Sequence, residues 1–251
     1  MEISEIWRYP VKSMLGEQLD QADVGPGGIQ GDRQWAVVDK ESGVSLSAKR
    51  YADLLSCQAW TSDGEVMIRT PDNSENPAGS AEVARALSDL LGRQVTTRSA
   101  EAAATIQHEF PTAITEGEGE PFLYEPETEA FVDCAPLQLL TTGTLVELQR
   151  LLPDSKIHRV RFRPNFLVKT KEIGFVENDW VSNDVTLGSL RCQVYDDTRR
   201  CIMVALGQDG LPRDTEVIRT ILKRNEGRAG VALNTQESGI VRRGAKVEVL
   251  T

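Results

Sequence analysis

The sequence reads Asp196-Asp197-Thr198-Arg199-Arg200-Cys201-Ile202-Met203 directly after a segment in which Leu190, Cys192 and Val194 alternate with polar residues. Apolar side chains at every second position lie on one face, which predicts a strand that ends near Cys201. Positive charge beside a cysteine favours the thiolate, which is both a nucleophile and a metal ligand. Cys201 is therefore a candidate functional residue. The alternative is a half-buried packing cysteine with solvated arginines beside it.

The composition is ordinary for a soluble globular protein. A chain of 251 residues forms one large domain or two modest ones, and 40% hydrophobic with 26% charged residues is typical of such domains. No apolar run reaches the length of a membrane-spanning helix. The first residues, 1–5, lack the basic and apolar segments of a signal peptide, so we expect a cytoplasmic protein without a membrane partner.

The charge balance excludes one class of partner. The net charge is −10 and the pI is about 4.9. Nonspecific nucleic-acid binding needs a basic face, so we expect no nucleic-acid partner. A few converging arginines can still bind a small anion inside an acidic protein.

Cysteine and histidine usage narrows the chemistry further. The four cysteines, Cys57, Cys134, Cys192 and Cys201, are widely spaced and form no Cys-x-x-Cys pair. This spacing favours free thiols in a reducing compartment over a zinc knuckle or a thioredoxin-like motif. With only two histidines in the chain, a His-rich metal site or a Ser-His-Asp triad is poorly supported.

Two polar residues follow the first predicted strand. Residues 3–9 alternate loosely and are bounded by Pro10, and Lys12 and Ser13 come just after it. Side chains that emerge where a strand ends are candidate ligand contacts. A solvent-exposed lysine in a turn is the alternative.

A predicted hairpin carries further basic groups. Arg33 precedes a compact apolar strand, residues 35–39, and the returning strand, residues 44–48, ends at Lys49 and Arg50. These groups are expected at the same end of the hairpin, where guanidinium and ammonium donors suit an anion. Solubilising surface charge is the alternative.

The middle of the chain suggests a boundary. A second hairpin is predicted at residues 56–60 and 65–70, a helix at residues 81–91 before Gly92, and a short strand at residues 94–98. Residues 100–130 are polar, acidic and rich in Gly, Pro and Glu, with Glu116-Gly117-Glu118-Gly119-Glu120 at the centre. We therefore expect two domains, residues 1–112 and 113–251.

The second half alternates strands with helices. Thr141 ends a strand and precedes a helix, so it is a candidate N-cap beside backbone N–H groups that also suit an anion. Arg163 and Asn165 flank Pro164 at the start of a strand, residues 166–168. A helix over residues 215–223 with Asp214 as its cap is expected, and strands at residues 230–233 and 246–250 close the domain.

Four of these clusters, in this order, resemble the MOSC family, the proteins related to the C-terminal domain of molybdenum cofactor sulfurase. They are Tyr9-Pro10-Val11-Lys12-Ser13, Gly31-Asp32-Arg33-Gln34-Trp35, Arg161-Phe162-Arg163-Pro164-Asn165 and Arg200-Cys201. The closer resemblance is to members with an N-terminal β-barrel extension, such as the amidoxime-reducing components. The resemblance implies a mainly β protein with a few helices (α+β), with a MOSC β-barrel core and a barrel-like N-terminal extension. Glu177 and Trp180 match residues that recur in the family and support its fold.

The resemblance also implies a site. It would bind the molybdenum cofactor, a pterin with a dithiolene and a phosphate, and Cys201 would be both metal ligand and catalytic residue. The matching cofactor contacts are Lys12, Ser13, Arg33, Arg50, Thr141, Arg163 and Asn165.

The implied function is reduction of N-hydroxylated or N-oxide groups of a small molecule at the metal. The alternative is a sulfur (persulfide) or cofactor carrier without turnover, and a catalytically empty β-barrel is less favoured because Cys201 is present. Two departures from the family matter. The earlier cysteine of the relatives' Cys-x-Arg-Cys is absent here, where the chain reads Thr198-Arg199-Arg200-Cys201. No cysteine-rich iron–sulfur segment follows, so we expect a separate electron-donor protein.

Overall fold

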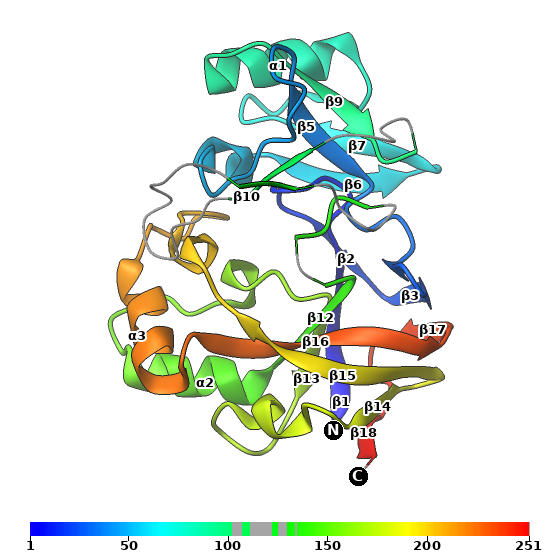
Figure 1. Cartoon of the computed structure of the whole chain (residues 1–251), viewed down its shortest axis with the longest axis vertical. Coiled ribbons are helices and arrows are strands. Elements are labelled where there is room, and N and C mark those ends of the chain that lie inside the picture. The colour runs from blue at the N-terminus through cyan, green and yellow to red at the C-terminus, as the bar shows by residue number, and fades with distance from the viewer. Residues whose placement is uncertain (102–106, 111–121, 125–129, 134, 251) are drawn as a thin grey trace.

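The computed structural model describes residues 1–101, 107–110, 122–124, 130–133 and 135–250, and Figure 1 shows their arrangement. Strands dominate the described chain, with three α-helices packed around them. This confirms the α+β class. Glu116–Glu120, Cys134 and the expected boundary near residue 112 lie outside the described residues.

A mixed eight-stranded sheet forms the lower part of the molecule in Figure 1. β12 and β13 pair in parallel, whereas the other neighbours in this sheet are antiparallel. The first strand of the chain therefore lies beside strands from its second half. The strand order is β18 (Val247–Leu250), β14 (Asp184–Leu187), β15 (Leu190–Arg199), β16 (Arg228–Glu237), β12 (Leu137–Thr141), β13 (Phe166–Lys169), β1 (Glu2–Arg8) and β2 (Glu17–Leu19).

The sheet curves back on itself without closing into a continuous barrel. Its β18 side returns to β1 through one antiparallel bridge between Glu2 and Lys246. Three backbone bonds support this seam, from Val247 N to Met1 O (3.0 Å), from Ile3 N to Ala245 O (2.9 Å) and from Gly244 N to Ile3 O (2.7 Å). Both termini accordingly lie at the same end of the molecule in Figure 1. The barrel expectation is thus met only in part, because a full ladder between β18 and β1 is not formed among the described residues.

Smaller sheets are built mainly from the first half of the chain. One has the order β6 (Gln58–Ser62), β7 (Glu65–Arg69) and β8 (Glu75–Pro77), which confirms the second predicted hairpin. Others pair β5 (Trp35–Asp39) with β9 (Val95–Ser99), and β10 (His108–Phe110) with β11 (Phe122–Tyr124). The last joins β17 (Gly239–Arg242), β3 (Gln21–Gly25) and β4 (Gly28–Ile29).

The first predicted hairpin is wrong in one respect. Residues 44–48 run beside β5 but form a single bridge, Val38 to Ser45, instead of a strand. β9 pairs with the whole of β5 and provides its ladder. The local alternation of residues 44–48 could not reveal this competition, because β9 lies some fifty residues further along the chain.

The helices begin and end where capping chemistry places them. α1 (Ala81–Leu91) starts at Ser80, whose hydroxyl accepts from Val83 N, and ends at left-handed Gly92. α2 (Thr142–Leu151) is capped by Thr141, and α3 (Thr215–Asn225) by Asp214. All three predicted helices are confirmed.

The buried apolar side chains form two clusters. One fills the interior of the curved sheet and includes Ile6, Phe166 and Val194. The other joins the N-terminal part to α2, α3 and the segment after β15, and it includes Met14, Phe162 and Ile202. Cys192 is fully buried in the first cluster, so it serves as a packing residue. In the described part of the chain, no helix combines the length and apolar character of a membrane span.

Candidate cofactor site

A cleft opens beside the segments that follow β1 and β15. It holds about 840 Å³ of space free of protein atoms, part of it open to solvent. Among the described residues that line it, seven side chains are basic and one is a carboxylate, so the cleft suits an anion. The lining consists of Lys12, Ser13, Arg33, Lys49, Phe131, Asp133, Ala135, Gln138, Arg161, Phe162, Arg163, Thr198, Arg199, Arg200, Cys201, Met203 and Val204.

Cys201 has the only described thiol in this lining. It follows β15, caps the short 3-10 helix η4 (Ile202–Ala205), and is partly exposed. Cys57 and Cys192 are buried, and burial raises the pKa of their thiols to about 11 and about 12. Of the described cysteines, Cys201 is therefore the one accessible to a metal or an electrophile.

Arg200 fixes the backbone directly before Cys201. Its Nε donates to the carbonyl of Ala229 at 2.6 Å. Its Nη1 donates to the carbonyl of Phe162 at 2.9 Å and to Oε1 of Gln138 at 3.2 Å. A planar guanidinium that spans three acceptors holds the three segments in one geometry. Arg200 thus positions the thiol as well as adding charge to the cleft wall.

Arg161 fixes the chain on the other side of Cys201. Its side chain is buried, and Nη1 donates to the carbonyls of Val204 (3.3 Å) and Leu206 (3.2 Å). Nη2 donates to the carbonyl of Pro212 at 2.8 Å. Backbone acceptors therefore occupy most of this guanidinium, and its main role is to hold η4 in place.

Two lysines share one carboxylate at the cleft. Nζ of Lys12 lies 2.6 Å from Oδ1 of Asp133, and Nζ of Lys49 lies 2.9 Å from Oδ2. Burial disfavours the charged carboxylate, but the two ammonium groups outweigh it and hold the pKa of Asp133 well below its usual range. Asp133 is thus ionised at neutral pH and compensates one of the two positive charges.

Tyr9 carries two arginines over its ring. The guanidinium carbons of Arg33 and Arg163 lie 5.0 Å and 4.3 Å from the ring centroid, which is within cation–π range. Arg163 Nη1 also donates to the carbonyl of Met14 at 2.7 Å. Burial lowers the pKa of Arg163 to about 10, so the side chain stays charged at neutral pH. The tyrosine ring therefore orients two fixed cations at the cleft.

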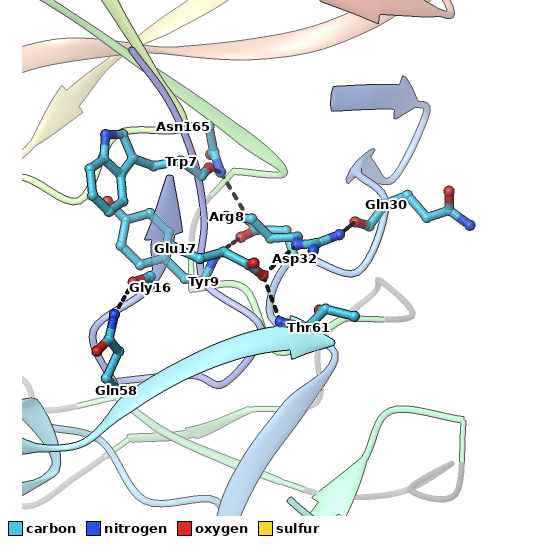
Figure 2. A network of polar contacts seen from close by, with 10 residues as sticks. All are labelled: Trp7, Arg8, Tyr9, Gly16, Glu17, Gln30, Asp32, Gln58, Thr61 and Asn165. Atoms are coloured by element: carbon cyan, nitrogen blue, oxygen red, sulfur yellow. Dashed lines mark hydrogen bonds and ion pairs between the residues drawn. The ribbon is translucent and has the colours of Figure 1, made fainter. Parts of the chain in front are cut away.

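Asp32 and Asn165 form a polar network behind these cations, and Figure 2 shows the hydrogen bond between the two residues. Nδ2 of Asn165 donates to Oδ2 of Asp32 at 3.1 Å, and Oδ1 of Asn165 accepts from Gln138 N at 3.1 Å. Asp32 in turn accepts from Tyr9 N at 2.7 Å and pairs with Arg33. Asn165 is fully buried and does not line the cleft. It positions Arg33 through Asp32 and has no direct place in the cleft lining.

Backbone strain gathers at the same place. Ser13, Arg33 and Arg163 have φ angles of 68°, 51° and 52°, a region that non-glycine residues seldom adopt. Ser13 is held there by its Oγ, which accepts from Ala48 N at 3.0 Å. Strained residues of this kind persist where the surrounding structure fixes them, and they cluster at functional sites.

Two predicted contacts lie elsewhere. Thr141 is fully buried, where it caps α2 and donates to Oε2 of Glu177 at 2.6 Å. Arg50 is exposed at the turn after residue 47 and is not part of the lining, whereas its neighbour Lys49 is. A one-residue difference in this turn decides which basic side chain faces the cleft, and the sequence could not resolve it.

The predicted set therefore divides. The structure brings together Lys12, Ser13, Arg33, Arg163 and Cys201 in one lining. The sequence did not identify Asp133 and Thr198 as members of the cleft lining. It indicated Arg50 where the structure places Lys49. Thr198 gave only a weak signal, because Asp196 interrupts the apolar alternation of Leu190, Cys192 and Val194 before it. Asp133 gave no local signal, because its partners lie far away in the chain.

Comparison with known proteins covers both parts of the chain. The MOSC N-terminal beta barrel domain family matches residues 1–110, and the MOSC domain family matches residues 126–248.

The chain is also similar to individual proteins. Mitochondrial amidoxime reducing component 2 of Bos taurus is 26% identical over 231 residues, covering 82% of this chain and 67% of that protein. Molybdenum cofactor sulfurase of Homo sapiens is 23% identical over 257 residues, covering 89% of this chain and 28% of that protein. The crystal structure of the YUAD protein from Bacillus subtilis aligns with a TM-score of 0.46 at 11% identity, covering 99% of this chain and 94% of the other. The two family matches confirm the resemblance seen in the four sequence clusters, and the chain belongs to the MOSC family.

Proposed function

We propose that this protein binds the molybdenum cofactor in the cleft and reduces N-hydroxylated or N-oxide groups of a small molecule, with Cys201 as the metal ligand. One observation carries the proposal. Cys201 shares a single lining with Lys12, Ser13, Arg33 and Arg163, which lie up to about 190 positions away in the sequence. A cysteine that serves only for packing would not need basic and hydroxyl side chains from distant segments around it.

The donors of the cleft fit the chemistry of the cofactor. A phosphate and a dithiolene are both anionic, and Lys12, Arg33 and Arg163 bring charge that is already oriented by Asp133 and Tyr9. The Ser13 hydroxyl accepts from Ala48 N, so it can still donate its own hydrogen. We expect these four side chains to hold the anionic groups.

The thiol fits the metal. A thiolate is a soft, anionic ligand, and a bound metal deprotonates a coordinating cysteine outright. When bound, the cofactor supplies two-electron oxygen-atom transfer. Arg200 and Arg161 keep the thiol in place by fixing the chain on both sides of it. Reduction of one N-hydroxyl group takes up two electrons and two protons and releases water, with a separate protein as the expected electron donor.

The test uses protein from a host that makes the cofactor. Molybdenum per polypeptide and the fluorescence of the oxidised pterin are measured first, and reduction of benzamidoxime with a chemical electron donor second. We expect both bound molybdenum and turnover. Protein that contains neither molybdenum nor pterin would refute the proposal.

A carrier role is the second candidate. The partial exposure of Cys201 favours it, since an accessible thiol can hold persulfide sulfur, and one relative is named a molybdenum cofactor sulfurase. Cyanide-releasable sulfur on Cys201 without molybdenum would support persulfide transfer. Bound molybdenum without turnover would support storage or delivery of the cofactor.

A further inference from the structure

Thr198 is a buried polar residue with no role in the site as described so far. It lies near the end of β15, three positions before Cys201, and the residue is 7% exposed. It nevertheless lines the cleft together with Cys201 and Arg199. The side chain is therefore hidden from bulk solvent but adjacent to the space that a ligand would fill.

The hydroxyl of Thr198 has no hydrogen-bond partner among the described residues. Buried polar groups are nearly always paired, and each exception calls for a specific reason, such as a bound molecule. An unpaired buried hydroxyl is unfavourable for folding, so packing alone gives no reason for a hydroxyl at this position.

The neighbours of Thr198 indicate what would pair with it. The charged side chains that line the cleft are basic apart from Asp133, and basic side chains can only donate. A molecule bound among them therefore presents acceptors. A threonine hydroxyl can donate its hydrogen to such an acceptor, whether oxygen or sulfur.

We propose that the Thr198 hydroxyl is a further binding group of this site and donates a hydrogen bond to an anionic atom of the cofactor beside Cys201. The inference rests on the proposed function. It assigns the hydroxyl a ligand-binding role and no role in the stability of the ligand-free fold.

The test compares Thr198→Val with Thr198→Ser. Valine keeps the shape of threonine and removes the hydroxyl, whereas serine keeps the hydroxyl. Thr97→Val is the matched control, because Thr97 is similarly buried at 6% exposure but lies outside the cleft lining and donates to the carbonyl of Ala78. All proteins are made in the cofactor-producing host, and bound molybdenum and pterin are followed during dialysis. The melting temperature of each cofactor-free protein is measured in parallel.

The expected pattern separates binding from structure. A hydrogen bond to a charged group corresponds to about a 10-fold to 100-fold change in affinity, so Thr198→Val should retain cofactor that much more weakly, with Thr198→Ser close to wild type. The melting temperature of cofactor-free Thr198→Val should equal or exceed that of the wild type, whereas Thr97→Val should melt lower and retain cofactor normally.

Three results would overturn the inference, and they can be told apart. Equal cofactor retention in Thr198→Val and the wild type would refute the role of the hydroxyl while leaving the proposed function intact. A wild-type protein without molybdenum or pterin would remove the proposed function, and this inference with it. A lowered melting temperature of cofactor-free Thr198→Val would show a structural role and count against the inference.

Discussion

At the residue scale, the cleft holds its positive charge in two ways. Lys12 and Lys49 share Asp133, so part of their charge is already compensated. Arg33 and Arg163 are oriented by the face of Tyr9, and Arg33 is also held by its ion pair with Asp32. A rigid guanidinium over an aromatic ring keeps its charge and its direction, and it needs no rearrangement when an anion arrives. We therefore expect the two arginines to keep their positions when a ligand binds. The two lysines should change theirs.

Lys49 and Arg50 provide a matched pair at this scale. Lys49→Gln removes a cation from the lining, and we expect cofactor retention to weaken about 10-fold, the effect of one charge-assisted contact. Arg50→Gln changes an exposed residue outside the lining and should leave retention nearly unchanged. Molybdenum per polypeptide after dialysis measures both. Greater loss in Arg50→Gln than in Lys49→Gln would contradict the placement of these side chains.

The sequence identified the residues of the site better than it identified their roles. The positions are distinctive because polar groups stand at strand ends: Lys12, Ser13 and Cys201 follow predicted strands, and Arg33 and Arg163 precede them. Whether a side chain faces the cleft or supports it from behind depends on contacts between distant segments. Asn165 and Thr141 turned out to be supports for that reason.

At the element scale, a buried carboxylate joins the parts of the fold behind the cleft. Glu177, in the 3-10 helix η3 (Val176–Trp180), accepts from Thr141, from Thr144 Oγ1 at 2.7 Å and from Gly230 N at 3.0 Å. This ties η3 to the start of α2 and to β16. Gly230 has a φ of 86°, and a Cβ there would lie 2.7 Å from the carbonyl of Leu139, so no other residue fits this close approach.

Thr141→Val tests whether this threonine supports the fold or binds cofactor. The change removes the N-cap of α2 and a donor to a buried carboxylate, so we expect the free energy of unfolding to fall by about 2–3 kcal/mol. Denaturant unfolding measures this loss. The folded fraction should retain cofactor like the wild type, and selective loss of cofactor at normal stability would restore Thr141 as a direct contact.

Glu177 also predicts a pH dependence of stability. Burial raises its pKa, and the hydrogen bonds from Thr141 and Thr144 only partly offset this effect. An acid with a raised folded-state pKa stabilises the fold in its protonated form. Its contribution is therefore full below its ordinary pKa of 4.5 and is lost as the pH rises through the folded-state pKa.

The corresponding measurement is the free energy of unfolding from acidic to neutral pH for the wild type and Glu177→Gln. The variant should lack the decline that begins above pH 4.5 in the wild type. Parallel profiles for the two proteins would show that the titration of Glu177 does not influence stability.

Elements with local signals were predictable, and those decided by long-range competition were not. Ser80, Gly92 and Asp214 mark helix ends that can be read directly from residue chemistry. The partner of β5 could not be read in this way, because residues 44–48 and β9 both carry strand-forming patterns. Pairing in a sheet depends on packing against neighbours more than on intrinsic preference.

At the scale of the whole molecule, the site forms because a segment near the N-terminus lies beside segments from the second half of the chain. β1 pairs with β13, and β13, β12, β16 and β15 follow in order across the sheet. The segment after β1 supplies Lys12 and Ser13, and the segment after β15 supplies Cys201. This convergence depends on non-local strand pairing, which a single sequence does not specify. The resemblance to a family could suggest it, and the strand order explains it.

The charge of the molecule fits the same picture. The chain carries a net charge of −10, whereas the lining of the cleft is predominantly basic. A local basic cleft inside an acidic protein attracts a small anion while its outer surface repels polyanions. This is consistent with a buried cofactor and with the absence of a nucleic-acid partner that we predict.

The most direct test of the cofactor site is X-ray absorption at the molybdenum edge on the wild type and Cys201→Ser, both purified from a cofactor-producing host. We predict that the wild type has one sulfur ligand more than the variant, because serine replaces the thiolate with an oxygen while the dithiolene sulfurs remain. An identical sulfur shell in both proteins would contradict the account, since Cys201 would then not be the ligand around which the basic cleft is built.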